Sequence, residues 1–149
     1  MPARSGRGGI RVASAALAGL GVAVSAYLTA SHFDEGLLVC GLSDCTTVQA
    51  SDYATILGVP VALLGLGMYV AVLGLVVARW VRPGLTLATT AATFGLTLAG
   101  AIFTGYLTYV ELFVLEAICQ WCVVSAVLTV LLLMTEGILV SRLLAIPEE

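Results

Sequence analysis

Two pairs of cysteines give this sequence its clearest capacity for chemistry. Cys119 and Cys122 form a C-x-x-C pair at the start of a long apolar run, and Cys40 and Cys45 form a C-x4-C pair farther upstream. Residues three apart on a helix are neighbours, and the free N–H groups of a helix N-terminus stabilise a thiolate. A thiolate is the species that attacks a disulfide or an electrophilic ring. The C-x-x-C pair therefore indicates thiol redox chemistry.

Two other uses of four cysteines compete with redox cycling. Four thiols can bind zinc, but zinc modules usually have tight spacing in both pairs and polar surroundings, which this chain lacks. The pairs could also be structural disulfides, although a C-x-x-C disulfide closes too small a loop to restrict the unfolded chain much. We expect no metal and favour an enzyme. The alternative is a non-catalytic four-helix membrane protein with structural disulfides or a four-cysteine metal site.

The composition places the sequence among membrane proteins. The chain has 149 residues, of which 60% are hydrophobic and 10% are charged. Soluble chains typically contain about 25% charged residues, whereas a lipid bilayer accepts a largely apolar exterior. The basic residues are six arginines without a basic tract, so the sequence indicates no nucleic-acid partner.

Four long apolar runs are the elements that must position the cysteines. They cover residues 12–31, 53–78, 83–110 and 117–140. A helix needs about 20 apolar residues to cross a hydrocarbon core of ~30 Å, and single runs of this length cross as helices, since only helices and closed barrels satisfy their backbone in lipid. We therefore expect an all-α, integral membrane four-helix bundle that forms a single domain over residues 1–149.

The arginines predict how this bundle lies in the membrane. In a four-span arrangement all six fall on one side, which the positive-inside rule makes cytoplasmic; they are Arg4, Arg7, Arg11, Arg79, Arg82 and Arg142. Both termini are then expected in the cytoplasm, and the loop 32–52 is expected on the outer face. The first run exceeds the roughly 7–15 apolar residues usual in a signal peptide, so we expect it to stay as a helix.

This topology brings both cysteine pairs to the outer face. Cys40 and Cys45 lie in the outer loop, and Cys119 and Cys122 lie in the first turns of the fourth helix, which starts on that side. The compartment outside the membrane is oxidising in bacteria, as is the ER lumen, so disulfides there persist or cycle. A thiol pair at this depth could meet a water-borne disulfide on one side and a lipid-borne quinone on the other. Glu136 lies about 21 Å below Cys122 and is expected in a solvated position near the inner interface.

Several short motifs occur in a characteristic order along the chain. They are Ser25-Ala-Tyr27-Leu-Thr29, the first cysteine pair, Ser51, Gly58-Val-Pro60, Gly65 with Tyr69, and Ala117-Ile-Cys-Gln-Trp-Cys122. Together they resemble the bacterial homologues of vitamin K epoxide reductase over nearly the whole chain. The resemblance implies a four-helix bundle around a quinone, menaquinone or ubiquinone, in the bacterial inner membrane.

The resemblance also implies a role for each cysteine. Cys40 would exchange disulfides with a thioredoxin-like (DsbA-like) protein, and Cys45 would pass electrons to Cys119. Cys122 would then reduce the quinone through a thiolate–quinone adduct. Many bacterial members carry a fused thioredoxin-like domain, and here the partner is expected to be a separate protein. The implied activity is that of a thiol:quinone oxidoreductase that supports disulfide bond formation.

Two further residues are expected beside the quinone. Ser51 matches a polar position that the family uses near the ring, although its hydroxyl could instead cap the second helix. The mammalian enzymes have a tyrosine one turn after the second C-x-x-C cysteine, where this sequence has Ala126, and this difference favours plain quinone reduction over epoxide reduction.

Pro60 lacks an N–H and should kink the second helix or mark its start. Trp121 is expected to anchor the chain at the membrane interface.

Overall fold

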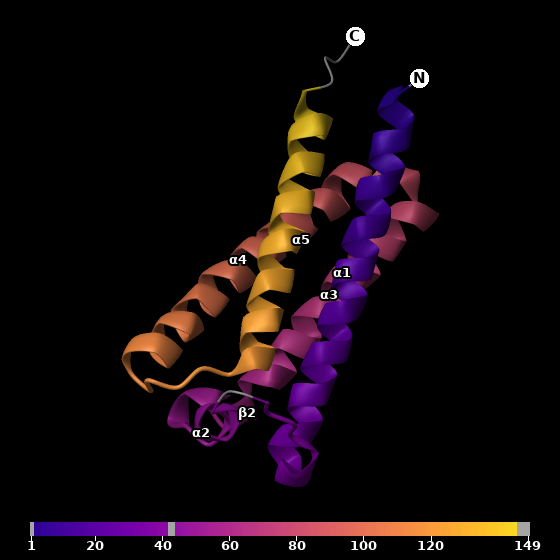
Figure 1. Cartoon of the computed structure of the whole chain (residues 1–149). Helices are drawn as coiled ribbons and strands as arrows, with labels where there is room; N and C mark the ends of the chain where they lie inside the picture. Colours follow the sequence, from indigo (N-terminus) through magenta and orange to yellow (C-terminus); the bar gives the residue numbers. More distant parts are fainter. Residues whose placement is uncertain (1, 42–43, 146–149) are drawn as a thin grey trace.

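Four long helices run side by side in the computed structural model, which describes residues 2–41 and 44–145 (Figure 1). They are α1 (Pro2–Phe33), α3 (Val61–Val81), α4 (Thr86–Phe113) and α5 (Gln120–Leu144). Each contains a segment that is long and apolar enough to cross a membrane. The predicted all-α membrane bundle is therefore confirmed.

The outward surface of the bundle is as apolar as a lipid-facing surface must be. Each long helix exposes large aliphatic side chains, for example Leu20, Val70, Ile102 and Val127, which are 52–68% exposed. Leaving apolar area in water costs about 25 cal/mol per Å², and surrounding lipid removes that cost. These side chains therefore need no protein partner.

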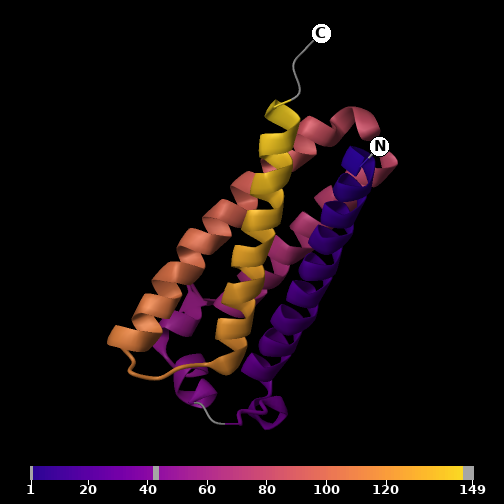
Figure 2. The same ribbon diagram turned by 45° about the horizontal axis from the view of Figure 1, so that its top comes forward.

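The helices pack as two layers that share an interior. α1 packs against α3 and α5, and α4 packs against the same two helices from the other direction (Figure 2). The fully buried centre contains Tyr69, Val72 and Leu132. Gly21 of α1 faces the ring of Tyr69 so closely that any Cβ at this position would collide with it. A small residue here lets the two backbones approach, as is common between transmembrane helices.

The second span begins later than its apolar run. α3 starts at Val61, whereas the run starts at Tyr53. The residues before it form the short helix η2 (Asp52–Ala54) and a hairpin of β1 (Thr55–Ile56) and β2 (Val59–Pro60), with Thr55 opposite Pro60. Leu57 and Gly58 form the turn with φ values of 53° and 82°, the two positive values that a type I′ turn requires. Pro60 marks the start of α3, since it precedes the first helical residue.

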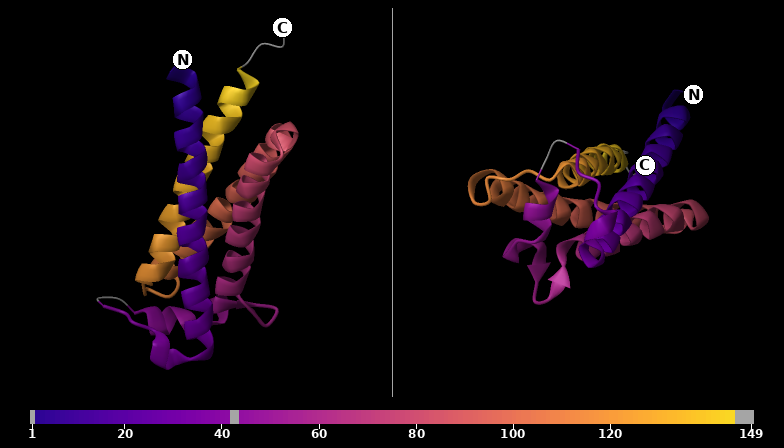
Figure 3. Two further views of the ribbon diagram at one scale, coloured as in Figure 1. Left: turned by 90° about the vertical axis from the view of Figure 1, so that its right-hand side faces the viewer. Right: turned by 60° about the horizontal axis from the view of Figure 1, so that its bottom comes forward.

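Both cysteine pairs lie at the same end of the bundle. The segment between α1 and α3 folds across this end and contains η1 (Glu35–Leu37) and α2 (Cys45–Gln49) besides the hairpin (Figure 3). The connection between α4 and α5 reaches the same end. The first turns of α1, the last turns of α5 and the turn that includes η3 (Pro83–Leu85) lie at the opposite end (Figure 1). Segments far apart in sequence thus come together around the cysteines.

A buried ion pair joins three helices in the half of the bundle opposite the cysteines. Arg79 Nη2 of α3 lies 2.8 Å from Glu136 Oε2 of α5, and both side chains are 0% exposed. The same Nη2 donates to Thr93 Oγ1 of α4 at 3.3 Å. The expectation that Glu136 is solvated is wrong, because helix packing turns it inward toward Arg79. Pairing offsets the high cost of a lone charge in a membrane interior.

Candidate active site

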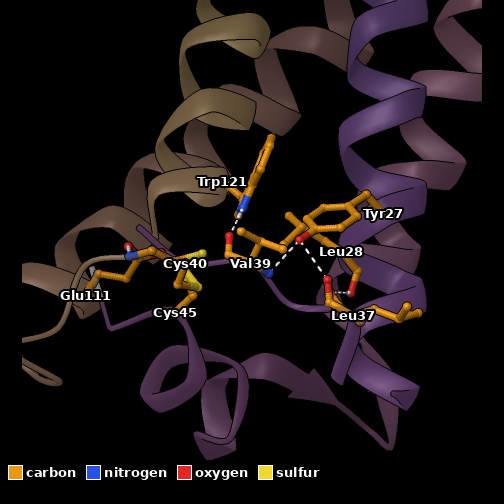
Figure 4. Close-up of a disulfide and its surroundings, with 10 residues drawn as sticks. Tyr27, Leu28, Leu37, Val39, Cys40, Cys45, Glu111 and Trp121 are labelled. Carbon is orange, nitrogen blue, oxygen red and sulfur yellow. Dashed lines mark hydrogen bonds between the residues drawn. A yellow bond between two sulfur atoms is a disulfide. The ribbon is translucent and has the colours of Figure 1, made fainter. Parts of the chain in front are cut away.

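The first cysteine pair is a disulfide held at the end of the bundle. Cys40 and Cys45 are bonded through their sulfur atoms, with their Cα atoms 6.1 Å apart (Figure 4). Cys45 is the first residue of α2 and is fully buried, whereas Cys40 is partly exposed. Only one end of this disulfide is therefore accessible from outside the protein.

Two aromatic side chains from different helices hold the segment just before Cys40. The Tyr27 hydroxyl donates to the Leu37 carbonyl at 3.0 Å and accepts the Val39 N–H at 2.8 Å. The Trp121 indole N–H donates to the Val39 carbonyl at 3.0 Å, and the two rings lie 4.9 Å apart (Figure 4). Trp121, expected to be an interface anchor, thus fastens the disulfide segment to α5. This is a contact that the sequence pattern did not indicate.

The second cysteine pair lies at the N-terminus of α5. Cys119 occupies the N-cap position and Cys122 lies in the first turn, and neither forms a disulfide. Cys119 is fully buried and packs in one cluster with Cys45, Val48 and Ala117. The structure therefore brings Cys119 next to the disulfide, while Cys122 is partly exposed one turn farther along the helix.

The environment of Cys119 favours its thiolate. Hydrogen bonding from the Cys122 side chain lowers the pKa of Cys119, and the backbone N–H groups of Cys122 and Trp121 act in the same direction. Burial and the negative charge of Glu111 oppose this shift without reversing it. The helix N-terminus and the second thiol thus make Cys119 the more acidic cysteine of the pair.

Glu111 is a site residue that our reading of the sequence missed. Its side chain is 6% exposed near the end of α4, and its Oε2 accepts the Cys119 backbone N–H at 3.1 Å. Its carbonyl accepts the Ala117 N–H at 3.0 Å, and its carboxyl also interacts with the Cys122 thiol. A signal was present, since an acid among apolar residues stands eight positions before Cys119.

A mostly apolar cavity of about 350 Å³ lies between the four long helices, next to the C-x-x-C pair. Binding pockets for small molecules commonly have volumes of about 300–1,000 Å³ and carry few polar groups. Here the polar and ionisable lining groups include Glu111, Cys122, Ser51, Ser125 and Thr129. Cys119 does not line the cavity. Of the two C-x-x-C cysteines, only Cys122 therefore lines the cavity, and both lie in or against the buried cluster that contains Cys45.

A group of hydroxyls forms the polar part of the cavity wall on α5. The Tyr69 hydroxyl lies 2.8 Å from the Ser125 carbonyl, 3.1 Å from Ser125 Oγ and 2.8 Å from Thr129 Oγ1. Residues three and four apart share one helix face, so Cys122, Ser125 and Thr129 form a single stripe. Ala126 is not among the residues that line the cavity. The lining face of α5 runs through Ser125 rather than the expected Ala126.

Ser51 lines the cavity and does not cap the second long helix. Its Oγ donates to the Val48 carbonyl at 2.7 Å, and it precedes η2 without a capping hydrogen bond from its side chain. α3 begins ten residues farther on, at Val61. The alternative of a cap for the second span is therefore wrong, because the hairpin separates Ser51 from that helix.

A comparison with known protein families identifies the chain. The model of the vitamin K epoxide reductase family matches residues 12–136. This match spans both cysteine pairs, Ser51 and Glu111, and it covers most of the chain. Family membership and the disulfide beside a free C-x-x-C pair fit a thiol oxidoreductase in a multi-pass membrane protein. The chain belongs to the vitamin K epoxide reductase family.

Proposed function

We propose that this protein is a membrane thiol:quinone oxidoreductase that takes electrons from a thioredoxin-like protein and passes them to a quinone. The observation that carries the proposal is the position of the C-x-x-C pair between the buried disulfide cysteine and the cavity. Cys119 lies in one buried cluster with Cys45 of the disulfide, and Cys122, which packs against the same cluster, also lines the apolar cavity. One pair can thus receive electrons from the loop and deliver them to a ring in the cavity.

The first step is a disulfide exchange with the partner. A thiolate of the partner attacks Cys40, the accessible end of the disulfide, and Cys45 leaves with the electron pair. The second partner thiol then displaces Cys40, so that the partner leaves with a disulfide and Cys40 and Cys45 become thiols. The burial of Cys45 supports this order, because the partner cannot reach it first.

The second step moves the electrons within the protein. In a turnover that begins with a Cys119–Cys122 disulfide, the Cys45 thiolate attacks Cys119, and Cys122 leaves. Cys40 then displaces Cys119 and restores the loop disulfide. The product is a bonded Cys40–Cys45 pair with Cys119 and Cys122 as thiols, which is the pattern found in this structure.

The last step reduces the quinone. Cys122 adds to the ring, Cys119 then attacks Cys122, and the pair ends as a disulfide while the ring becomes a hydroquinone. Menaquinone and ubiquinone both carry an apolar chain that suits the apolar walls of the cavity. Ser51 and Ser125 supply hydroxyls at those walls, and we propose that they contact the quinone. Ser125 takes the place in this proposal that Ala126 had in the sequence-based expectation.

We further propose that the protein lies in the bacterial inner membrane with its cysteines outside and both termini in the cytoplasm. Arg82 caps η3 and Arg142 lies in the last turn of α5, and both elements lie at the end of the bundle opposite the cysteines. Residues 32–52 contain neither lysine nor arginine. This asymmetry supports the orientation, because cytoplasmic loops carry the excess of basic residues.

The proposal is tested by anaerobic reaction of the reduced protein with a quinone. Wild-type protein in nanodiscs should lose two thiols for each quinone reduced, and Cys122→Ser should abolish the reaction. Cys40→Ala should retain quinone reduction and lose oxidation of a thioredoxin-like substrate. If quinone never changes the thiol count of the wild type, the proposed activity is wrong. Stoichiometric bound zinc would instead favour the four-cysteine metal site.

A further inference from the structure

We propose that Glu111 is a catalytic residue that carries the thiol protons of the cysteine pair to the quinone, an inference that rests on the proposed function. Two thiols and one quinone give one disulfide and one hydroquinone, so two protons must move from sulfur to oxygen along with two electrons. Cys119 is fully buried, and the cavity that Cys122 lines has mostly apolar walls. A fixed acid–base group is therefore needed near them.

Three contacts place the Glu111 carboxyl where such an acid–base group is needed. Its carboxyl accepts the backbone N–H of Cys119 at 3.1 Å, interacts with the Cys122 thiol and lines the same cavity as Cys122. Figure 4 draws it among the surroundings of the disulfide. The side chain reaches both cysteines and the proposed quinone from α4, the helix opposite the C-x-x-C pair.

The other ionisable groups that line the cavity are poorer proton carriers. Among the described lining residues these are Cys122 itself, Tyr53 and Tyr69, and Glu111 is the carboxylic acid of the set. A phenol releases a proton much less readily than a carboxylic acid. Tyr69 also hydrogen-bonds to α5. The lining groups from α1, which include Ser25 and Leu28, carry no titratable side chain.

The first proton moves as the carbon–sulfur bond forms. The Glu111 carboxylate takes the Cys122 thiol proton, and the Cys122 sulfur adds to a ring carbon of the quinone. The electron pair of that ring passes to one carbonyl oxygen, which becomes an oxyanion. Glu111 then gives its proton to this oxygen and returns to the carboxylate.

The second proton moves as the disulfide forms. Glu111 takes the proton of Cys119, and the Cys119 sulfur attacks the Cys122 sulfur. The carbon–sulfur bond breaks, and its electron pair returns to the ring and places negative charge on the second oxygen. Glu111 protonates this oxygen, so the hydroquinone leaves with both thiol protons and Cys119 and Cys122 are left as a disulfide.

A purely structural role for Glu111 makes a different prediction. Its carboxyl and carbonyl together hold the connection between α4 and α5, at Cys119 and Ala117. Glu111→Gln keeps an oxygen that can accept the Cys119 N–H but cannot carry a proton. Glu111→Leu loses both functions. A structural role predicts that the glutamine variant behaves as wild type, whereas a proton carrier predicts that it fails.

The experiment measures a single turnover by anaerobic mixing of pre-reduced protein with menaquinone in a stopped-flow instrument. We expect Glu111→Gln to slow quinone reduction by roughly 10²–10⁴-fold, the usual contribution of a general acid–base group. The wild-type rate should fall at low pH as the carboxylate becomes protonated, and this dependence should be absent in the variant. Glu116→Gln, which alters an exposed acid of the same connection, should match the wild type.

Each outcome separates the inference from its alternatives. Reduction of the Cys40–Cys45 disulfide by dithiothreitol should be equal in wild type and Glu111→Gln, which shows that the fold is intact. A Glu111→Gln rate equal to wild type would overturn the proton-carrier role while leaving the thiol:quinone activity in place. A slow variant that keeps the wild-type pH dependence would also overturn it. If wild type itself does not react with quinone, the proposed function fails and the role of Glu111 fails with it.

Discussion

The indole N–H of Trp121 donates a hydrogen bond to the carbonyl of Val39 at 3.0 Å. Trp121 stands between Cys119 and Cys122, and Val39 is the residue before Cys40. One side chain of the C-x-x-C turn therefore holds the loop that carries the disulfide. This contact links the segments that carry the two cysteine pairs, so changing it tests electron transfer between them.

Trp121→Phe should slow transfer between the cysteine pairs and leave quinone reduction unchanged. The phenyl ring retains contact with Tyr27 but loses the N–H donor, and a hydrogen bond contributes roughly 0.5–1.5 kcal/mol, which corresponds to a slowing of about twofold to tenfold. The check is to add dithiothreitol to fully oxidised protein and follow the appearance of Cys119 and Cys122 thiols by quenched mass spectrometry. Trp80→Phe is the control, since Trp80 is exposed near the opposite end. Equal rates in both variants would contradict the prediction.

Glu136→Gln should destabilise the bundle strongly. The substitution leaves the Arg79 guanidinium buried without its charge partner, which typically costs about 3–5 kcal/mol. Replacing both partners, as in Arg79→Met with Glu136→Leu, should recover most of the loss because no buried charge is left. Unfolding of detergent-purified protein with increasing denaturant measures the difference. A single variant as stable as the wild type would show that the pair is dispensable.

Gly21→Ala should destabilise the protein and disturb the cavity. The added Cβ collides with the ring of Tyr69, and overpacking of this kind costs about 1–3 kcal/mol. Because the Tyr69 hydroxyl contacts Ser125 and Thr129, quinone affinity should fall as well. Gly19→Ala is the matched control on the same helix, since no heavy atom lies within 4 Å of its added Cβ. The prediction is wrong if both variants have the same melting temperature.

Cys119 should become reactive at a lower pH than an ordinary cysteine. Hydrogen bonding from Cys122 lowers the pKa of Cys119, so its thiolate, the reactive form, persists as the pH falls below the usual thiol range. Cys122→Ala removes the donor and should shift the reactivity of Cys119 to higher pH, whereas Cys122→Ser keeps a hydroxyl donor and should shift it less. Alkylation rates at Cys119, mapped by mass spectrometry over a pH series, provide the measurement. A shift to lower pH in the alanine variant would contradict the assignment.

The architecture of the bundle could be predicted from the sequence because its causes act along the chain. The length of each apolar run decides whether a helix can span a bilayer. Because successive spans run in opposite directions, the loop after the first span and the start of the fourth span lie on the same side, which brings Cys40 and Cys122 to one end. Pro60 was expected either to kink the second helix or to mark its start, because it lacks an N–H, and α3 begins directly after it.

The direction in which individual side chains point was decided only by the tertiary structure. Helix rotation selects Ser125 rather than Ala126 for the cavity, and a difference of one residue turns a side chain by about 100°. The sequence pattern predicted a solvated Glu136, whereas helix packing buries it against Arg79 of another helix. Glu111 becomes a site residue because the connection to α5 folds back and places the Cys119 N–H against its carboxyl. The sequence by itself determined the spans and the end at which the thiols meet, since these depend on hydrophobic length and order. Which groups face the thiols depends on contacts between helices, and no local pattern encodes those.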